Sequence, residues 1–76
     1  MGFGGYVYHE YKATPIVNAK LICGDAIAYT DSTGYYKMYL PKGQQLDVEV
    51  YINDELQLIQ FIGTSVNQEK NFPIKV

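Results

Sequence analysis

Apolar and polar side chains alternate most clearly between residues 35 and 40, and this run sets the pattern for the rest of the chain. One side of the run is mostly apolar and holds Tyr36, Met38 and Leu40. The other side holds Tyr35, Lys37 and Tyr39. A period of two residues is typical of a half-buried β-strand, so we expect a strand here.

Turn-forming residues bound this run on both sides. Asp31 and Ser32 have side chains that hydrogen-bond the backbone two residues on, and Gly34 adopts a positive φ without steric cost. Pro41 cannot donate to a strand ladder, so the strand ends there. Gly43 closes the turn that leads into the next alternating run.

The same alternation predicts seven short strands, at residues 6–11, 16–23, 26–30, 35–40, 46–52, 55–62 and 71–76. Gly24-Asp25 and Asn53-Asp54 supply two of the turns, and Asn18 tolerates a left-handed backbone at a bulge. Pro73 makes the last strand an edge strand. The side chains expected to point inward include Val7, Ala19, Leu21, Cys23, Phe72, Ile74 and Val76.

No segment shows a sustained period of 3.6 residues with helix caps. The chain is therefore predicted to be all-β, a small seven-stranded Greek-key β-sandwich. The glycine-rich residues 1–5 are expected to be a flexible lead-in, and residues 6–76 a single sandwich domain.

Composition argues against several classes of function. The chain has 76 residues and a formal net charge of −2, and its six basic residues are all lysine. Without arginine or a basic patch, a nucleic-acid binder that neutralises phosphates is not expected. Because there is one cysteine, no internal disulfide forms, and Cys23 is expected to be a buried small hydrophobe.

The location of the protein follows from what the sequence lacks. No apolar run approaches the ~18 residues of a membrane span, and the first residues do not read as a signal peptide. We expect that the chain does not insert into a membrane. We expect it to be synthesised in the cytoplasm, with incorporation into a virion as one outcome. An extracellular location is expected only if the chain is a fragment of a secreted protein.

No catalytic, cofactor or metal site is expected from the residues. The single histidine, His9, is interpreted as a surface or edge residue, because no nucleophile accompanies it. Residues 30–34 lack the alternating carboxylates of a calcium loop and are interpreted as a turn. A cross-link between Lys20 and Asn71 beside Glu49 is disfavoured, because Lys20 and Glu49 fall on the outward phase of their strands.

Tyrosine is the feature that stands out, with eight residues of that type. Five fall on the outward phase of their strands and are the candidate partner-binding residues: Tyr6, Tyr8, Tyr35, Tyr39 and Tyr51. Tyrosine is favoured at interfaces because it covers area at small entropy cost and keeps a polar tip. The competing interpretation is that these rings only pair across strands and stabilise a small sheet. Ile22, also outward, favours a covered face.

Short motifs recur in a characteristic order: G-x-V at 5–7, P-I-V-N-A at 15–19, T-D-S-T-G-Y-Y at 30–36, M-Y-L-P-K-G at 38–43 and N-F-P-I at 71–74. In these the chain resembles the carboxypeptidase regulatory-like family, whose fold is a transthyretin-like (prealbumin-like) seven-stranded sandwich. It departs from the family pattern at Asn18, Gln45-Leu46 and Asn53-Asp54. The resemblance implies a non-catalytic module and carries no catalytic residues with it.

The favoured hypothesis is a structural or interaction module that docks on a larger protein assembly through a tyrosine-rich face or an open sheet edge. A virion accessory protein, capsid-decorating or tail-associated, is one concrete form, and a homo-oligomer is another use of the same surface. The alternatives are a carbohydrate-binding or adhesion module, in which tyrosine rings stack on sugars, and a spacer domain of a secreted multidomain surface protein. An enzyme is the least favoured class.

Overall fold

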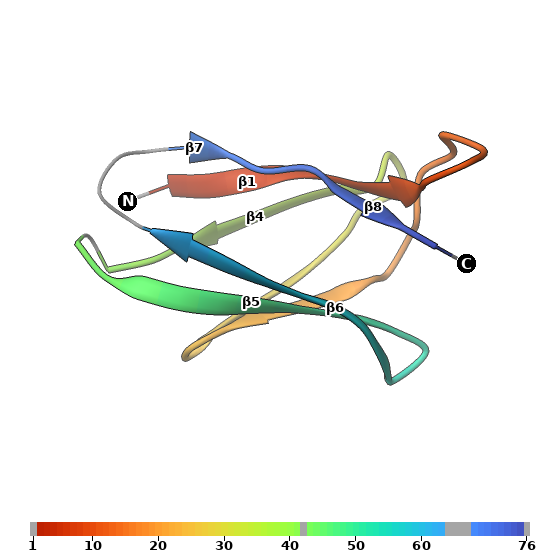
Figure 1. The fold of residues 1–76 in the computed structure, drawn as a ribbon. Helices are drawn as coiled ribbons and strands as arrows, with labels where there is room; N and C mark the ends of the chain where they lie inside the picture. The colour runs from red at the N-terminus through yellow and green to blue at the C-terminus, as the bar shows by residue number, and fades with distance from the viewer. Residues whose placement is uncertain (1, 42, 64–67, 76) are drawn as a thin grey trace.

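The computed structural model describes residues 2–41, 43–63 and 68–75, and every element in that part of the chain is a β-strand. The strands, in chain order, are β1 (Gly2–His9), β2 (Lys20–Cys23), β3 (Ala26–Tyr29), β4 (Tyr35–Tyr39), β5 (Gln45–Ile52), β6 (Glu55–Gly63), β7 (Gln68–Glu69) and β8 (Phe72–Ile74). They form two layers that face each other (Figure 1). No helix among the described residues has the length and hydrophobicity to cross a membrane.

The first layer has β1 at its centre. β4 pairs antiparallel with one side of β1, while β7 and β8 both pair parallel with β1. Phe3 lies opposite Gln68 and Val7 lies opposite Phe72, so β7 and β8 act as one interrupted strand. The second layer is antiparallel in the order β3-β2-β5-β6. When β7 and β8 are counted as one interrupted strand, the structure is the predicted seven-stranded all-β sandwich.

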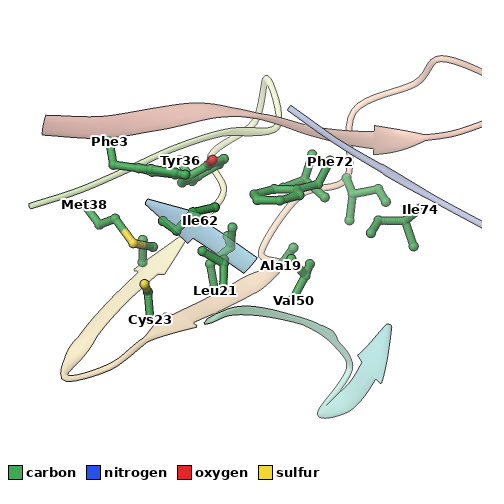
Figure 2. Close-up of a cluster of buried hydrophobic side chains, with 14 of the residues drawn as sticks. Phe3, Ala19, Leu21, Cys23, Tyr36, Met38, Val50, Ile62, Phe72 and Ile74 are labelled. Carbon is green, nitrogen blue, oxygen red and sulfur yellow. The ribbon is translucent and has the colours of Figure 1, made fainter. Parts of the chain in front are cut away.

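The core lies between the two layers and follows the predicted alternation. In β4, Tyr36, Met38 and Leu40 are buried, whereas Lys37 and Tyr39 between them are exposed. Figure 2 shows side chains of both sheets meeting, with Tyr36 and Phe72 above Leu21 and Val50. The largest fully buried side chains are Tyr36, Phe3, Phe72, Leu21, Val7, Val48, Val50 and Cys23.

Most of the described turn residues with positive φ are glycine, asparagine or aspartate, and Ala13, at 55°, is an exception. Gly24 and Gly34 have φ of 60° and 80°. Asn18 has the expected left-handed backbone, with φ of 61°, but it lies in a turn before β2 rather than at a strand bulge. At the β5–β6 hairpin, both Asn53 and Asp54 have positive φ, at 52° and 65°. Positive φ at both central residues of a two-residue hairpin loop is typical of a type I′ turn, whose twist matches that of the flanking strands.

Several strand boundaries differ from the prediction. The first strand ends at His9 rather than at residue 11, β7 lies outside the predicted strands, and β8 covers only Phe72–Ile74 of the predicted 71–76. The prediction of a flexible glycine-rich lead-in is wrong, because β1 already begins at Gly2. Within it, Phe3 is only 1% exposed and pairs with Met38 of β4. The second strand begins at Lys20 rather than at residue 16. The segment before it is held instead by Thr30, whose hydroxyl donates to the Ile16 carbonyl at 2.6 Å and accepts from the Ala19 amide at 2.8 Å. The expected inward position of Val76 lies outside the described residues.

Gly5 is required where β1 meets the chain between β7 and β8. A Cβ at this position would overlap the carbonyl oxygen of Lys70 and lie 2.7 Å from its carbonyl carbon. Around this contact, the Tyr36 hydroxyl donates to the Lys70 carbonyl at 2.6 Å and the Tyr6 amide donates to Asn71 Oδ1 at 3.0 Å. The absence of a side chain at Gly5 therefore lets the segment between β7 and β8 lie directly beside β1.

Candidate interaction face

Four of the five predicted partner-binding tyrosines lie on the outer face of the first sheet. Tyr6 and Tyr8 project outward from β1, and Tyr35 and Tyr39 from β4, because the neighbouring Val7, Tyr36 and Met38 are buried. Tyr6 and Tyr35 are cross-strand partners, and their ring centroids are 5.2 Å apart in an edge-on arrangement of 63°. Tyr39 is 72% exposed, with Lys37 Nζ 5.4 Å from its ring centroid.

Tyr35 is committed to packing within the sheet. Its hydroxyl oxygen lies 2.9 Å from where a Cβ of Gly4 would stand, so the ring lies over the glycine. The Tyr35 ring therefore covers backbone that no side chain of β1 shields at this point. With Tyr6 against its edge, this pair serves cross-strand stabilisation, the competing interpretation of the tyrosine pattern.

Tyr51 lies on the opposite side of the molecule, on the outer face of the second sheet. Its cross-strand partner in β2 is Lys20, and its hydroxyl donates to Glu49 Oε1 at 2.5 Å. The hydrogen bond to this carboxylate raises the pKa of the Tyr51 phenol. The five predicted tyrosines are thus divided between two faces and do not form one surface.

The outer face of the second sheet carries a larger apolar surface, which sequence reasoning found only in part. We call it the apolar face; its residues are Ile22, Ile27, Tyr29, Tyr51, Leu56, Ile59 and Phe61. Register places them side by side: Ile22 pairs with Ile27 on β3 and with Glu49 on β5, and Glu49 pairs with Ile59 on β6. Ile27 and Ile59, at opposite edges, are 56% and 55% exposed.

Polar groups lie within the apolar face. Lys20 and Glu49 occupy its two central strands, and a shallow hollow of about 230 Å³ is lined by Lys20, Ile22, Tyr51 and Asp54. Asp47, on the same side of β5 and opposite Phe61, adds a second carboxylate. An apolar surface with an amine and carboxylates among its side chains favours a partner that supplies matching charges.

Most residues of the apolar face were missed from the sequence for two reasons. Ile22 was recognised as outward, but the same phase was not carried across the Gly24-Asp25 turn to Ile27 and Tyr29. In β6 the register shifts opposite Val50 and Tyr51, which breaks the period of two that would have placed Ile59 and Phe61 on the outside.

Elsewhere, the side chains that could take part in catalysis or ligand binding are dispersed, buried or already hydrogen-bonded within the fold. Asp31 Oδ1 accepts from the Thr33 amide at 2.8 Å and hydroxyl at 2.6 Å, and from the Tyr35 amide at 3.1 Å, which confirms the predicted turn. The hydrogen bond from the Thr33 side chain is the main reason that the pKa of Asp31 lies below its usual range. Burial raises the pKa of the Cys23 thiol, which disfavours the thiolate.

Three further observations concern the remaining candidates. His9 lies at one end of the sandwich, beside a hollow lined in part by Ile16, Ile52 and Glu55, and its Nδ1 atom is buried without a hydrogen-bond partner. Among residues 2–41, 43–63 and 68–75, no three His, Cys, Asp or Glu side chains gather as metal ligands would. The three residues of the disfavoured cross-link are not brought together. Lys20 and Glu49 belong to the second sheet, whereas Asn71 accepts a hydrogen bond from the Tyr6 amide of the first sheet.

Comparison with known proteins adds a likeness of fold. No protein-family model and no curated protein matches this sequence. The structure is similar to one chain in the crystal structure of a type II cohesin–X-dockerin complex from Acetivibrio cellulolyticus, a C-terminal interface mutant, with a TM-score of 0.70 at 17% sequence identity. The likeness covers 97% of this chain and 55% of the other, so this chain spans about half the length of the chain it matches. At this level of identity the comparison shows a shared β-sandwich fold.

Proposed function

We propose that this chain is a non-enzymatic interaction module that docks on a larger protein assembly through the apolar face. The observation that carries the proposal is the exposure of that face, where Ile27, Tyr29, Leu56, Ile59 and Phe61 are all about half exposed or more. Contiguous apolar surface of this kind, with polar groups among it, is characteristic of protein interaction sites.

Energetics favour a covered face. Burying apolar surface releases roughly 25 cal/mol for each Å² removed from water, and about half of the surface of these side chains is still in water in the single chain. The core on the other side of the same sheet is already complete, since Leu21, Cys23, Val48 and Val50 are buried against the first sheet. The apolar face is therefore available to a partner without cost to the core.

Sugar stacking is less well supported. A carbohydrate platform needs aromatic faces presented side by side, whereas the Tyr6 and Tyr35 rings meet edge to face and Tyr35 lies over Gly4. The non-enzymatic part of the proposal is supported by the engagement of Asp31 in its turn and by the burial of Cys23.

The finer parts of the proposal have weaker support. The similar sandwich occurs in a complex between a cohesin and an X-dockerin, which is consistent with an assembly role. We also propose a relationship to the carboxypeptidase regulatory-like family, because the motif residues Gly5 and Gly34 occupy structurally demanding positions. A virion accessory protein, decorating a capsid or attached to a tail, is the concrete form we propose, supported by the Lys-, Asn-, Ile- and Tyr-rich composition without arginine.

Cross-linking capture from the native source tests the docking surface when three chains are compared. The wild type is expected to capture one assembly protein, Ile27→Asp combined with Tyr29→Ser is expected to lose it, and the matched control Tyr39→Ser on the other sheet is expected to retain it. All three positions are more than half exposed, so circular dichroism should show the same fold. Equal capture by all three chains, or loss with Tyr39→Ser alone, would contradict docking through the apolar face. Retardation of the wild type on polysaccharide gels without protein capture would instead favour carbohydrate binding.

A further inference from the structure

The four edges of the two sheets are unequal in how well they are protected. β3 has four residues and β4 five, and these two edge strands pack against each other across the sandwich. β7 and β8 form an interrupted edge that contains Pro73. β6 is an edge strand of nine residues with no proline and no lysine. Short length, interruption, proline and lysine all protect an exposed edge strand, because its unpaired backbone groups are otherwise a template for another strand.

The segment of β6 after its bulge is regular and uncharged. The register shift opposite Val50 and Tyr51 leaves residues 58–62 in continuous pairing with β5. Ile59 and Phe61 project from this segment onto the apolar face and are 55% and 59% exposed, whereas Ile62 is buried. Along residues 58–62, the edge of the sheet is therefore regular, has apolar side chains and carries no charge.

The geometry points to a second copy of this chain as the strand that pairs with β6. We propose an antiparallel pairing of residues 58–62 with the same residues of the other copy, about a two-fold axis at Gln60. In this register Ile59 lies opposite Phe61 of the other copy, and Phe61 lies opposite its Ile59. A β-branched residue opposite an aromatic one is a favourable cross-strand pair, and the symmetry forms it twice.

The lack of charge on the segment allows a second copy to pair with it. Residues 56–62 carry no charge, so two copies approach without like-charge contact along the paired segment. Glu55, the one charged residue of β6, lies beyond the bulge and outside the pairing. The Gln60 side chain donates to the Phe61 carbonyl at 3.3 Å in the single chain, a long bond that backbone pairing replaces.

The pairing joins two four-stranded sheets into one of eight strands. Because the two-fold axis is perpendicular to the sheet, both apolar faces lie on the same side and become continuous across the junction. This goes beyond the docking proposal: the dimer forms along an edge and leaves Ile27 and Tyr29 of each copy exposed. A pairing of this length makes a small interface, so the dimer is expected to be weak.

Sedimentation equilibrium of the full chain, between about 10 and 500 μM, tests the proposal. The wild type is expected to shift from monomer to dimer across this range. Ile59→Lys places an amine on the paired edge and is expected to raise the dissociation constant at least tenfold. The matched control is Ile27→Lys, which adds the same charge to the same face at equal exposure but on the opposite edge, and is expected to leave the constant within about twofold.

A charge-pair rescue tests the register itself. Ile59→Lys and Phe61→Glu are each expected to remain monomeric alone, whereas their equimolar mixture is expected to dimerise, because the register sets the introduced amine opposite the introduced carboxylate while the second Ile59–Phe61 pair stays intact. A wild type that stays monomeric throughout would overturn the proposal. So would equal loss of the dimer with Ile27→Lys, which indicates face-to-face stacking, or a mixture that fails to associate.

Discussion

Gly5→Ala is the substitution for which the structure makes the strongest statement about stability. The added methyl would overlap the Lys70 carbonyl oxygen and stand 2.7 Å from its carbon, well inside van der Waals contact. Both atoms belong to the backbone, so no side-chain rotation relieves the overlap. The segment through Lys70 and Asn71 has to move away from β1.

The size of the effect follows from the hydrogen bonds that this movement breaks. Three cross the contact: the Tyr36 hydroxyl to the Lys70 carbonyl, the Tyr6 amide to Asn71 Oδ1, and the Lys70 amide to the Gly4 carbonyl. At about 1 kcal/mol net for each, the substitution lowers the free energy of unfolding by about 3 kcal/mol. A chain of this length has a total of only about 4–11 kcal/mol.

Urea unfolding followed by circular dichroism measures the loss. With a slope of about 1 kcal/mol per M for a small domain, the midpoint of Gly5→Ala should fall by about 3 M, or the chain should be unfolded in buffer. Gly63→Ala is the matched control, since a Cβ there meets nothing within 4 Å, and should change stability by no more than about 0.5 kcal/mol. If the two variants unfold at the same urea concentration, the close approach of β1 and Lys70 is refuted.

Two further predictions concern polar groups. Thr30→Val removes the hydroxyl that serves the Ile16 carbonyl and the Ala19 amide, and should cost about 2–4 kcal/mol because both are left unpaired in a buried site; Thr30→Ser, which keeps the hydroxyl, should retain most of the stability in the same urea assay. Because the pKa of Asp31 is lower in the folded chain, the native state binds fewer protons, so this carboxylate stabilises the fold above its unfolded pKa of about 3.9 and the contribution is lost as pH falls through the lower folded pKa. Urea midpoints should therefore fall less steeply with acid in Asp31→Asn than in the wild type, and identical pH profiles would show that the bonds from Thr33 do not persist in solution.

The strand pattern could be predicted from the sequence because local rules and tertiary packing agree over most of the chain. The alternation at 35–40 needs one buried and one outward side, and the structure has both. Asn53-Asp54 forms the predicted hairpin turn because the backbone of these residues tolerates positive φ. Pro73 lies in an edge strand, where a missing amide donor does the least harm.

The N-terminal glycines show where local reasoning fails. Glycine is expected in flexible segments, yet Gly4 and Gly5 are buried within β1 because Tyr35 covers one and the Lys70 carbonyl approaches the other. Both neighbours are distant in sequence. A glycine selected for close approach has the same local signature as one selected for flexibility, and only the packed structure separates the two.

By itself, the sequence determined the all-β class, most of the strands and the inward side chains, since periodicity and turn chemistry act over a few residues. Only the tertiary structure decided which outward side chains share a surface. Tyr51 is separated from the other candidate tyrosines because it belongs to the other sheet. Ile27 and Ile59 lie on one face, at opposite edges of the second sheet, because β2 and β5 pair between their strands. Strand order is set by long-range pairing and core packing, which no local pattern encodes, so the apolar face and the open edge of β6 emerge only in the folded chain.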